Sequence, residues 1–131
     1  MSLPLKGKIL ALDLGTRRTG VSISDADQKI AFLRDELEHT SVGELLAHLK
    51  KLTEADDVVG ILAGLPLHMN GQRSEQTERV LNQIEKLKSL NLPIQTIDER
   101  LSTEEAFAPK MKIVDSRAAQ ILLENFIRTK L

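Results

Sequence analysis

A short apolar run with a single charge near its end constrains the fold of this chain more than any other feature. Residues Lys8 to Leu14 read KILALDL and are followed by Gly15. This pattern is typical of a strand that is buried on both faces at the centre of a sheet. A carboxylate in such a strand is costly unless it has a partner, because burial removes its hydration. The run therefore predicts a covered central strand, with Asp13 as a functional group close to its end.

The next two apolar runs indicate that the sheet begins with antiparallel strands. Val21 to Ser24 alternates apolar and polar residues, and Ile30 to Leu33 follows the turn-like segment Asp25 to Gln28. Strands joined by short connections rich in turn residues are usually hairpin neighbours. We expect a three-stranded meander with the Ile30 to Leu33 strand at one edge of the sheet.

Helical patterns separate the later strands. Ser41 and Glu44 form a capping-box pattern, and two further stretches carry apolar residues at helical spacing. The predicted elements are a helix from Ser41 to about Thr53, a strand from Asp57 to Leu62, a helix from about Ser74 to Leu90, a strand from Pro93 to Asp98 and a helix from Asp115 to Lys130. This alternation predicts an α/β fold, with one mixed five-stranded sheet and helices on both faces.

Length and composition limit the class of protein. The chain has 131 residues, close to the ~150 of an average domain, so we expect one domain over residues 1–131. The net charge is -1, so any contact with a polyanion must be local. The chain has no cysteine, and its three histidines lack the spacing of a zinc-binding helix, so any bound metal would have oxygen ligands. No apolar stretch approaches the ~18 residues that cross a membrane, so we expect a cytoplasmic protein without a membrane partner.

Four carboxylates fall where strands end or where the last helix begins. They are Asp13, Asp98, Glu99 and Asp115. Sites in α/β sheets gather at the carboxyl ends of the strands. Carboxylates that meet there repel one another and need a cation, and a cluster of oxygen ligands suits Mg²⁺ or Mn²⁺. Two such ions roughly 3.5 to 4 Å apart would activate a water and stabilise the leaving oxygen of a phosphodiester.

These carboxylates also have structural interpretations. Asp115 could be the N-cap of its helix, and Asp98 or Glu99 could end a strand in solvent. Alternation along Pro93 to Glu99 directs Asp98 and Glu99 to opposite faces, so only one should be a direct metal ligand, and we favour Asp98. The predicted metal ligands are therefore Asp13, Asp98 and Asp115, and Glu99 remains a catalytic candidate.

Basic residues lie beside the predicted acidic edge. The turn Gly15 to Gly20 contains two arginines and could present N–H groups and guanidinium groups to a phosphate, although it could also be a tight turn with solvated arginines. The loop Gly64 to Arg73 follows a strand and should lie at the same edge. The predicted nucleic-acid-binding residues are Arg17, Arg18, Arg100, Lys110, Lys112 and Arg117.

Four ordered blocks of the chain resemble the YqgF family. The blocks are LDLGTRRTGVSISD (12–25), GLPLHMNG (64–71), DERLSTEEA (98–106) and VDSRAAQILLENFI (114–127). This RNase-H-like family is described as Holliday junction resolvases or as pre-16S ribosomal RNA nucleases. The resemblance implies an RNase-H-like domain and a metal-dependent nuclease. It also implies an acidic site made by Asp13, by Asp98 or Glu99, and by Asp115, with Arg17, Arg18 and Arg100 at the basic positions.

The chain departs from the family pattern in two segments. His68 stands where the family usually has an asparagine, and the segment between Ala106 and Asp115 is shorter than usual, with its basic run reduced to Lys110 and Lys112. The chain has no Trp or Tyr that could stack on bases. We therefore expect recognition of phosphates and backbone shape rather than of base identity.

Three functional hypotheses follow. The first is a nuclease that uses Mg²⁺ or Mn²⁺ to process the 5' end of pre-16S rRNA in ribosome biogenesis. Precursor rRNA is favoured over a DNA junction, ribosomal particles are possible partners, and the protein would be a monomer or weak homodimer, whereas a resolvase would be a symmetric dimer. The second is an ATP-handling module, because Asp13 to Thr16 resembles the first phosphate loop of actin-like ATPases. The third is a non-catalytic RNA- or ribosome-binding factor of the same fold.

Overall fold

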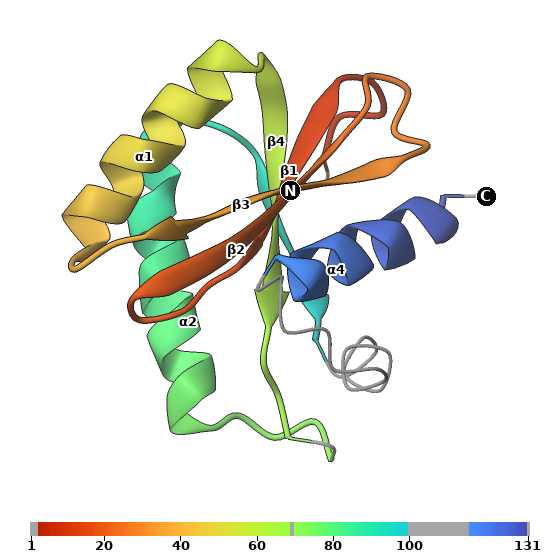
Figure 1. Ribbon diagram of the computed structural model, residues 1–131. Coiled ribbons are helices and arrows are strands. Elements are labelled where there is room, and N and C mark those ends of the chain that lie inside the picture. Colours follow the sequence, from red (N-terminus) through yellow and green to blue (C-terminus); the bar gives the residue numbers. More distant parts are fainter. Residues whose placement is uncertain (1–2, 69, 100–115, 131) are drawn as a thin grey trace.

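The computed structural model contains one five-stranded sheet with helices on either side (Figure 1). The structure describes residues 3–68, 70–99 and 116–130. Its elements are β1 (Lys8–Asp13), β2 (Arg18–Ser24), β3 (Ala31–Glu38), α1 (Val42–Ala55), β4 (Val58–Leu65), α2 (Glu75–Leu87), η1 (Lys88–Leu90), β5 (Ile94–Asp98) and α4 (Arg117–Arg128). Across these ranges, none of the helices has the length and apolarity needed to cross a membrane.

The order of the strands is β3-β2-β1-β4-β5, so β1 lies at the centre of the sheet. Strands β1 and β2 pair antiparallel, with Asp13 opposite Gly20, and β2 pairs antiparallel with β3. Strand β4 is parallel to both β1 and β5. The prediction of a mixed five-stranded sheet around a central first strand is confirmed.

Three strands are longer than the sequence pattern predicted, and one of them, β4, continues past Leu62 to Leu65. Strand β3 is an edge strand as expected, but it continues past Leu33 to Glu38 through a segment that is polar apart from Leu37. Its pairing with β2, rather than burial of side chains, extends it, and an edge strand can keep polar side chains in water. Strand β2 begins at Arg18, so the predicted turn Gly15 to Gly20 is shorter than expected and Thr19 is buried within the strand.

The two faces of β1 contribute to two separate hydrophobic cores. Leu10 and Leu12 belong to the core that contains residues of α1 and α2, such as Leu45 and Ile84. Residues 9 and 11 belong to the core that contains Leu123 and Phe126 of α4. Figure 1 shows α1 and α2 on one side of the sheet and α4 on the other, which confirms the prediction of helices on both faces.

Side-chain caps determine where the first two helices begin. The Ser41 side chain accepts a hydrogen bond from the backbone N of Glu44 at 3.1 Å, as expected of an N-cap. The Glu44 carboxylate accepts from the backbone N of Thr40 at 3.3 Å instead of from Ser41, so the predicted capping box is only half formed. Helix α2 has a full capping box between Ser74 and Thr77, which the sequence analysis did not identify.

Helix α4 is attached to β2 at its first turn. The backbone N of Val21 donates a hydrogen bond to Ser116 Oγ at 2.9 Å, and Ser22 Oγ donates to the carbonyl oxygen of Ala119 at 2.9 Å. The N-cap position of the helix is Ser116, one residue after Asp115, which lies outside the described residues. These bonds fix the start of α4 beside the end of β1, since Val21 pairs with Leu12.

Gly15 occupies a position that no other residue can take without movement of the backbone. A Cβ atom at Gly15 would lie 2.2 Å from the carbonyl oxygen of Arg18. We therefore expect Gly15→Ala to lower the free energy of unfolding by about 1–3 kcal/mol, as overpacking usually does. Gly43→Ala is the matched control, because its Cβ would meet only Ser41 Oγ at 3.8 Å in α1, and a helical alanine should stabilise by up to ~1 kcal/mol. Urea unfolding measures both changes, and equal effects of the two substitutions would contradict this assignment.

Candidate acidic active site

Strand alternation brings the carboxyl groups of Asp13 and Glu99 to the same face of the sheet. Asp13 follows Ala11 on the face that α4 covers, and Ile97 packs against the same core, so Glu99 points in the same direction. The backbone N of Glu99 donates to the carbonyl oxygen of Leu65 at 3.1 Å, which extends the pairing with β4 beyond Asp98. The Glu99 side chain forms a hydrogen bond with Asp13. Two carboxyl groups from two separate strands are therefore in contact at the carboxyl edge of the sheet.

A glycine on the intervening strand makes room for this contact. A Cβ atom at Gly64 would lie 2.6 Å from Leu122 Cδ1 and 3.4 Å from the carboxyl carbon of Glu99. Strand β4 lies between β1 and β5, so the Glu99 side chain reaches Asp13 across the backbone of β4. Gly64 begins the GLPLHMNG segment, and its lack of a side chain admits both Glu99 and α4.

The environment of Glu99 favours its protonated form. Burial raises the pKa of Glu99 to about 9, and the hydrogen bond and the negative charge of Asp13 act in the same direction. The charge of Asp98 also raises this pKa, while the guanidinium of Arg79 lowers it. At neutral pH the acid pair therefore holds a proton, which Glu99 donates to the Asp13 carboxylate.

The two acidic residues at the end of β5 occupy different positions. Asp98 lies on the opposite face of the strand from Glu99 by alternation, and its charge acts on Glu99 from there. Glu99 forms the hydrogen bond with Asp13, whereas the sequence analysis favoured Asp98 as the direct metal ligand. Alternation alone separates the two acids onto opposite faces, and the packing of Ile97 against the core that contains Ile9 identifies Glu99 as the acid on the same face as Asp13. Which of Asp98 and Glu99 binds a metal ion stays a prediction.

A cavity of about 320 Å³ lies beside Asp13 and carries charges of both signs. Arg18 lines it and pairs with Glu36 at 3.8 Å between Nη1 and Oε1. Arg17 is exposed in the turn before β2, and Arg117 is exposed in α4, where it donates to Gln120 Oε1 at 2.8 Å. Arg18 is therefore the predicted basic residue that the structure brings to the cavity beside Asp13.

Arg79 also lines this cavity, and the sequence analysis did not identify it. Its Nη1 donates to Gln83 Oε1 at 2.9 Å and to the carbonyl oxygen of Leu14 at 3.4 Å. Gln83 Nε2 in turn donates to the carbonyl oxygen of Gly15 at 2.9 Å. Gln83 is buried within the apolar stripe of α2, between Val80 and Leu87, and a polar residue in such a stripe is the signal that could have revealed this contact.

The described residues include oxygen ligands that suit a divalent cation, but they do not form a complete metal site. No group of three or more His, Asp or Glu side chains suited to hold a metal ion occurs in the described part of the chain. Asp13 and Glu99 supply oxygen ligands of the kind that Mg²⁺ and Mn²⁺ prefer, and a cation there would offset the burial and the neighbouring charge that raise the pKa of Glu99. Four predicted site residues lie outside the described residues, namely Arg100, Lys110, Lys112 and Asp115.

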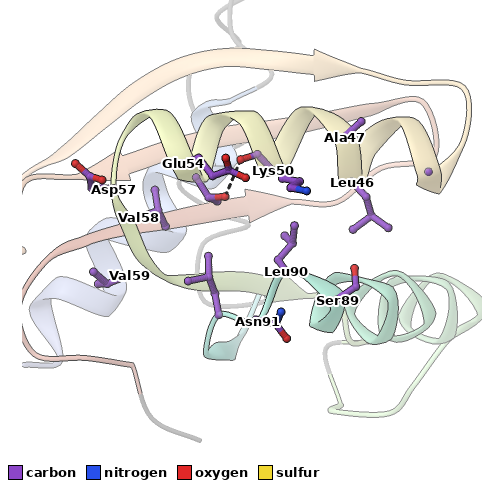
Figure 2. A pocket seen from close by; sticks show the side chains of 13 residues that line it. Leu46, Ala47, Lys50, Glu54, Asp57, Val58, Val59, Ser89, Leu90 and Asn91 are labelled. Atoms are coloured by element: carbon purple, nitrogen blue, oxygen red, sulfur yellow. Dashed lines mark hydrogen bonds between the residues drawn. The ribbon is translucent and has the colours of Figure 1, made fainter.

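A larger cavity lies elsewhere in the molecule and has no part in this site. It measures about 840 Å³ and lies between α1 and the segment that follows α2 (Figure 2). Its lining includes Val58 at the start of β4, whereas the acidic pair lies near the end of that strand. Figure 2 shows the side chains of Leu46 and Lys50 from α1 and of Leu90 from η1 around it.

Comparison with known sequences identifies related proteins over most of the chain. The family model RuvX, described as "Holliday junction resolvase", matches residues 7–129. A protein of Maridesulfovibrio salexigens named "Putative pre-16S rRNA nuclease" is 35% identical over 131 residues, which cover 92% of this chain and 97% of the relative. A Clostridium novyi protein of the same name is 37% identical over 131 residues, with coverage of 92% and 97%.

Solved structures share the fold of this chain. A structure titled "T. thermophilus RuvC in complex with Holliday junction substrate" has a TM-score of 0.64 at 10% identity and covers 94% of both chains. A second Thermus thermophilus RuvC structure has a TM-score of 0.62 at 11% identity and covers 94% of this chain and 95% of that one. The sheet and its helices therefore form an RNase H-like fold that resembles RuvC.

The raised pKa of Glu99 predicts that the metal-free protein loses stability as the pH rises. The folded protein holds the Glu99 proton up to a pKa of about 9, whereas the unfolded chain releases it near 4.5. Between these values the folded state binds more protons, so the free energy of unfolding falls with increasing pH. We expect a loss of roughly 1 kcal/mol or more between pH 5 and pH 8 in EDTA, measured by urea unfolding.

Glu99→Gln should remove most of this pH dependence, because a glutamine amide can donate to Asp13 at any pH. Glu54→Gln, which changes an exposed acid of α1, should keep the slope of the original protein. An equal slope in the Glu99 and Glu54 variants would show that the acid pair does not hold a proton.

Proposed function

The chain belongs to the RuvX family, also called YqgF, and we propose that it is a nuclease that hydrolyses phosphodiester bonds in structured nucleic acid. The names of its relatives support pre-16S rRNA as the substrate. Processing at the 5' end of this RNA would place the protein in ribosome biogenesis, in the cytoplasm. The observation that carries the proposal is the hydrogen-bonded pair of Asp13 and Glu99 at the carboxyl edge of the sheet. Residues 1–131 would form one nuclease domain.

The proposed metal site uses the acidic residues at this edge. Asp13, one of Glu99 and Asp98, and Asp115, which precedes the residue that anchors α4 to β2, would hold Mg²⁺ or Mn²⁺. Two bound ions would supply an activated water and stabilise the leaving oxygen. Asp13 and Glu99 would release their shared proton as they take up the cation, so metal binding should strengthen as the pH rises.

Basic residues would hold the backbone of the substrate. Arg18 lines the cavity beside Asp13, and a guanidinium there can bind two oxygens of one phosphate. We propose Arg17 and Arg117 as further phosphate contacts. Both are exposed, and Arg17 directly precedes β2 while Arg117 is the first residue of α4. Arg100, Lys110 and Lys112 complete the proposed set on the strength of the sequence pattern.

We expect Asp13→Asn to abolish hydrolysis while the metal-free protein stays at least as stable, because Asn Oδ1 can still accept a hydrogen bond from protonated Glu99 and the buried negative charge is removed. The assay uses purified protein with Mg²⁺ or Mn²⁺ and a labelled rRNA precursor that carries a 5' extension. Glu54→Gln serves as the control with an exposed acid changed. Marked destabilisation by Asp13→Asn would instead assign Asp13 a structural role.

A four-way DNA junction in the same assay separates the alternatives. Cleavage of the RNA alone supports the proposed substrate, and paired symmetric cuts in the junction by a dimer would support a resolvase. Binding of RNA without cleavage under either metal would contradict the proposal and favour a non-catalytic RNA-binding factor.

Arg17, in the turn before β2, and Arg18, at the start of β2, should control the salt dependence of binding. Each phosphate contact releases counterions and contributes about -0.7 to the log–log salt slope for single strands and about -0.9 for duplexes. Arg17→Ala combined with Arg18→Ala should therefore flatten the slope by roughly one to two units without changing the fold. Arg128→Ala at the far end of α4 should leave the slope unchanged. An unchanged slope in the double variant would place the nucleic acid elsewhere.

A further inference from the structure

Arg79 brings a positive charge to the acidic site from the opposite layer of the molecule. It projects from α2, which covers one face of the sheet, whereas Asp13 and Glu99 lie on the face that α4 covers. The guanidinium reaches the segment directly after Asp13, where it donates to the carbonyl oxygen of Leu14, and it lines the same cavity of about 320 Å³ as Asp13. Its charge is close enough to act on Glu99.

The position of this guanidinium is fixed by neutral partners. In the described part of the chain, Nη1 makes its two hydrogen bonds to carbonyl oxygens, one from the Gln83 side chain at 2.9 Å and one from Leu14 at 3.4 Å. Gln83 is 6% exposed and is itself held by the carbonyl oxygen of Gly15. A buried amide thus orients the arginine without neutralising its charge.

The other arginine of the cavity has a different electrostatic environment. Arg18 lies at the start of β2 and forms an ion pair with Glu36, with 64% of its side chain exposed. Solvent and the Glu36 carboxylate both weaken its field. Arg79 is therefore the better placed of the two to stabilise negative charge that develops beside the acid pair.

We propose that Arg79 is a further catalytic residue, which binds a non-bridging oxygen of the phosphodiester in the cavity beside Asp13. This inference rests on the proposed nuclease function. In the hydrolysis, the oxygen of a water molecule bonds to phosphorus and the bond to the leaving sugar oxygen breaks. The water loses a proton and the leaving oxygen gains one, both by exchange with solvent. Arg79 stays protonated and stabilises the negative charge that the phosphoryl oxygens gain in the transition state.

The test compares Arg79→Gln, Arg79→Lys and Arg128→Gln. We expect Arg79→Gln to lower kcat at saturating substrate by about 10²-fold, as loss of one preorganised donor does in other hydrolases. It should also flatten the salt slope of binding by about 0.7 to 0.9, measured in Ca²⁺ with a labelled RNA hairpin. Arg79→Lys should keep the slope and recover only part of kcat, because lysine keeps the charge but not the planar fork. Arg128→Gln should change neither quantity.

A purely structural role for Arg79 gives a different result. If the arginine only ties α2 to the segment after β1, Arg79→Gln will lower Tm but leave both kcat and the salt slope unchanged below the unfolding transition, and that outcome would overturn the proposal. If the protein without substitutions cleaves neither substrate, the proposed nuclease function is wrong. The binding measurement still tests the contact of Arg79 with phosphate in that case. An unchanged salt slope in Arg79→Gln would then reject the contact with phosphate.

Discussion

The burial of β1 on both faces is the constraint on which the rest of the structure depends. Residues 10 and 12 pack against the helices of one layer, and residues 9 and 11 pack against α4 in the other. Because side chains alternate along a strand, this double burial also determines the direction of Asp13. A shift of one residue in β1 would move leucines and the carboxylate to the wrong layers together. The position of the acid is therefore as firmly specified as that of the core.

The acidic groups at the edge of the sheet lower the local stability of the fold, and the surrounding contacts hold these groups in position. Burial and the neighbouring charge of Asp13 make ionised Glu99 unfavourable, so the pair holds a proton in the absence of a cation. Gly64 admits the two carboxyl groups to each other, and the Gln83 amide holds the Arg79 guanidinium nearby. Such an arrangement of mutually repelling groups is typical of sites selected for chemistry rather than for stability.

Sequence patterns predicted the architecture better than the contacts of the site. Apolar runs were enough to place β1 at the centre and β3 at the edge, because the pattern of burial dominates both assignments. The polar end of β3 was missed since strand pairing, not hydrophobicity, extends it. Asp13 was identified as a lone charge in an apolar strand, and Glu99 was named as a catalytic candidate. The contact between Glu99 and Asp13, and the place of Arg79, required knowledge of which face each element presents. That knowledge depends on packing between elements distant in sequence, which periodicity does not report.

The hydrogen bonds at the start of α4 have a consequence for the order in which the elements of the protein fold. Those from Val21 to Ser116 and from Ser22 to Ala119 join residues separated by 95 and 97 positions. Contacts between such distant segments form late, because most of the chain must first be available. During synthesis the N-terminal hairpin and β4 can assemble first. In this order of assembly, the face that carries Asp13 would stay open to solvent until α4 packs over it.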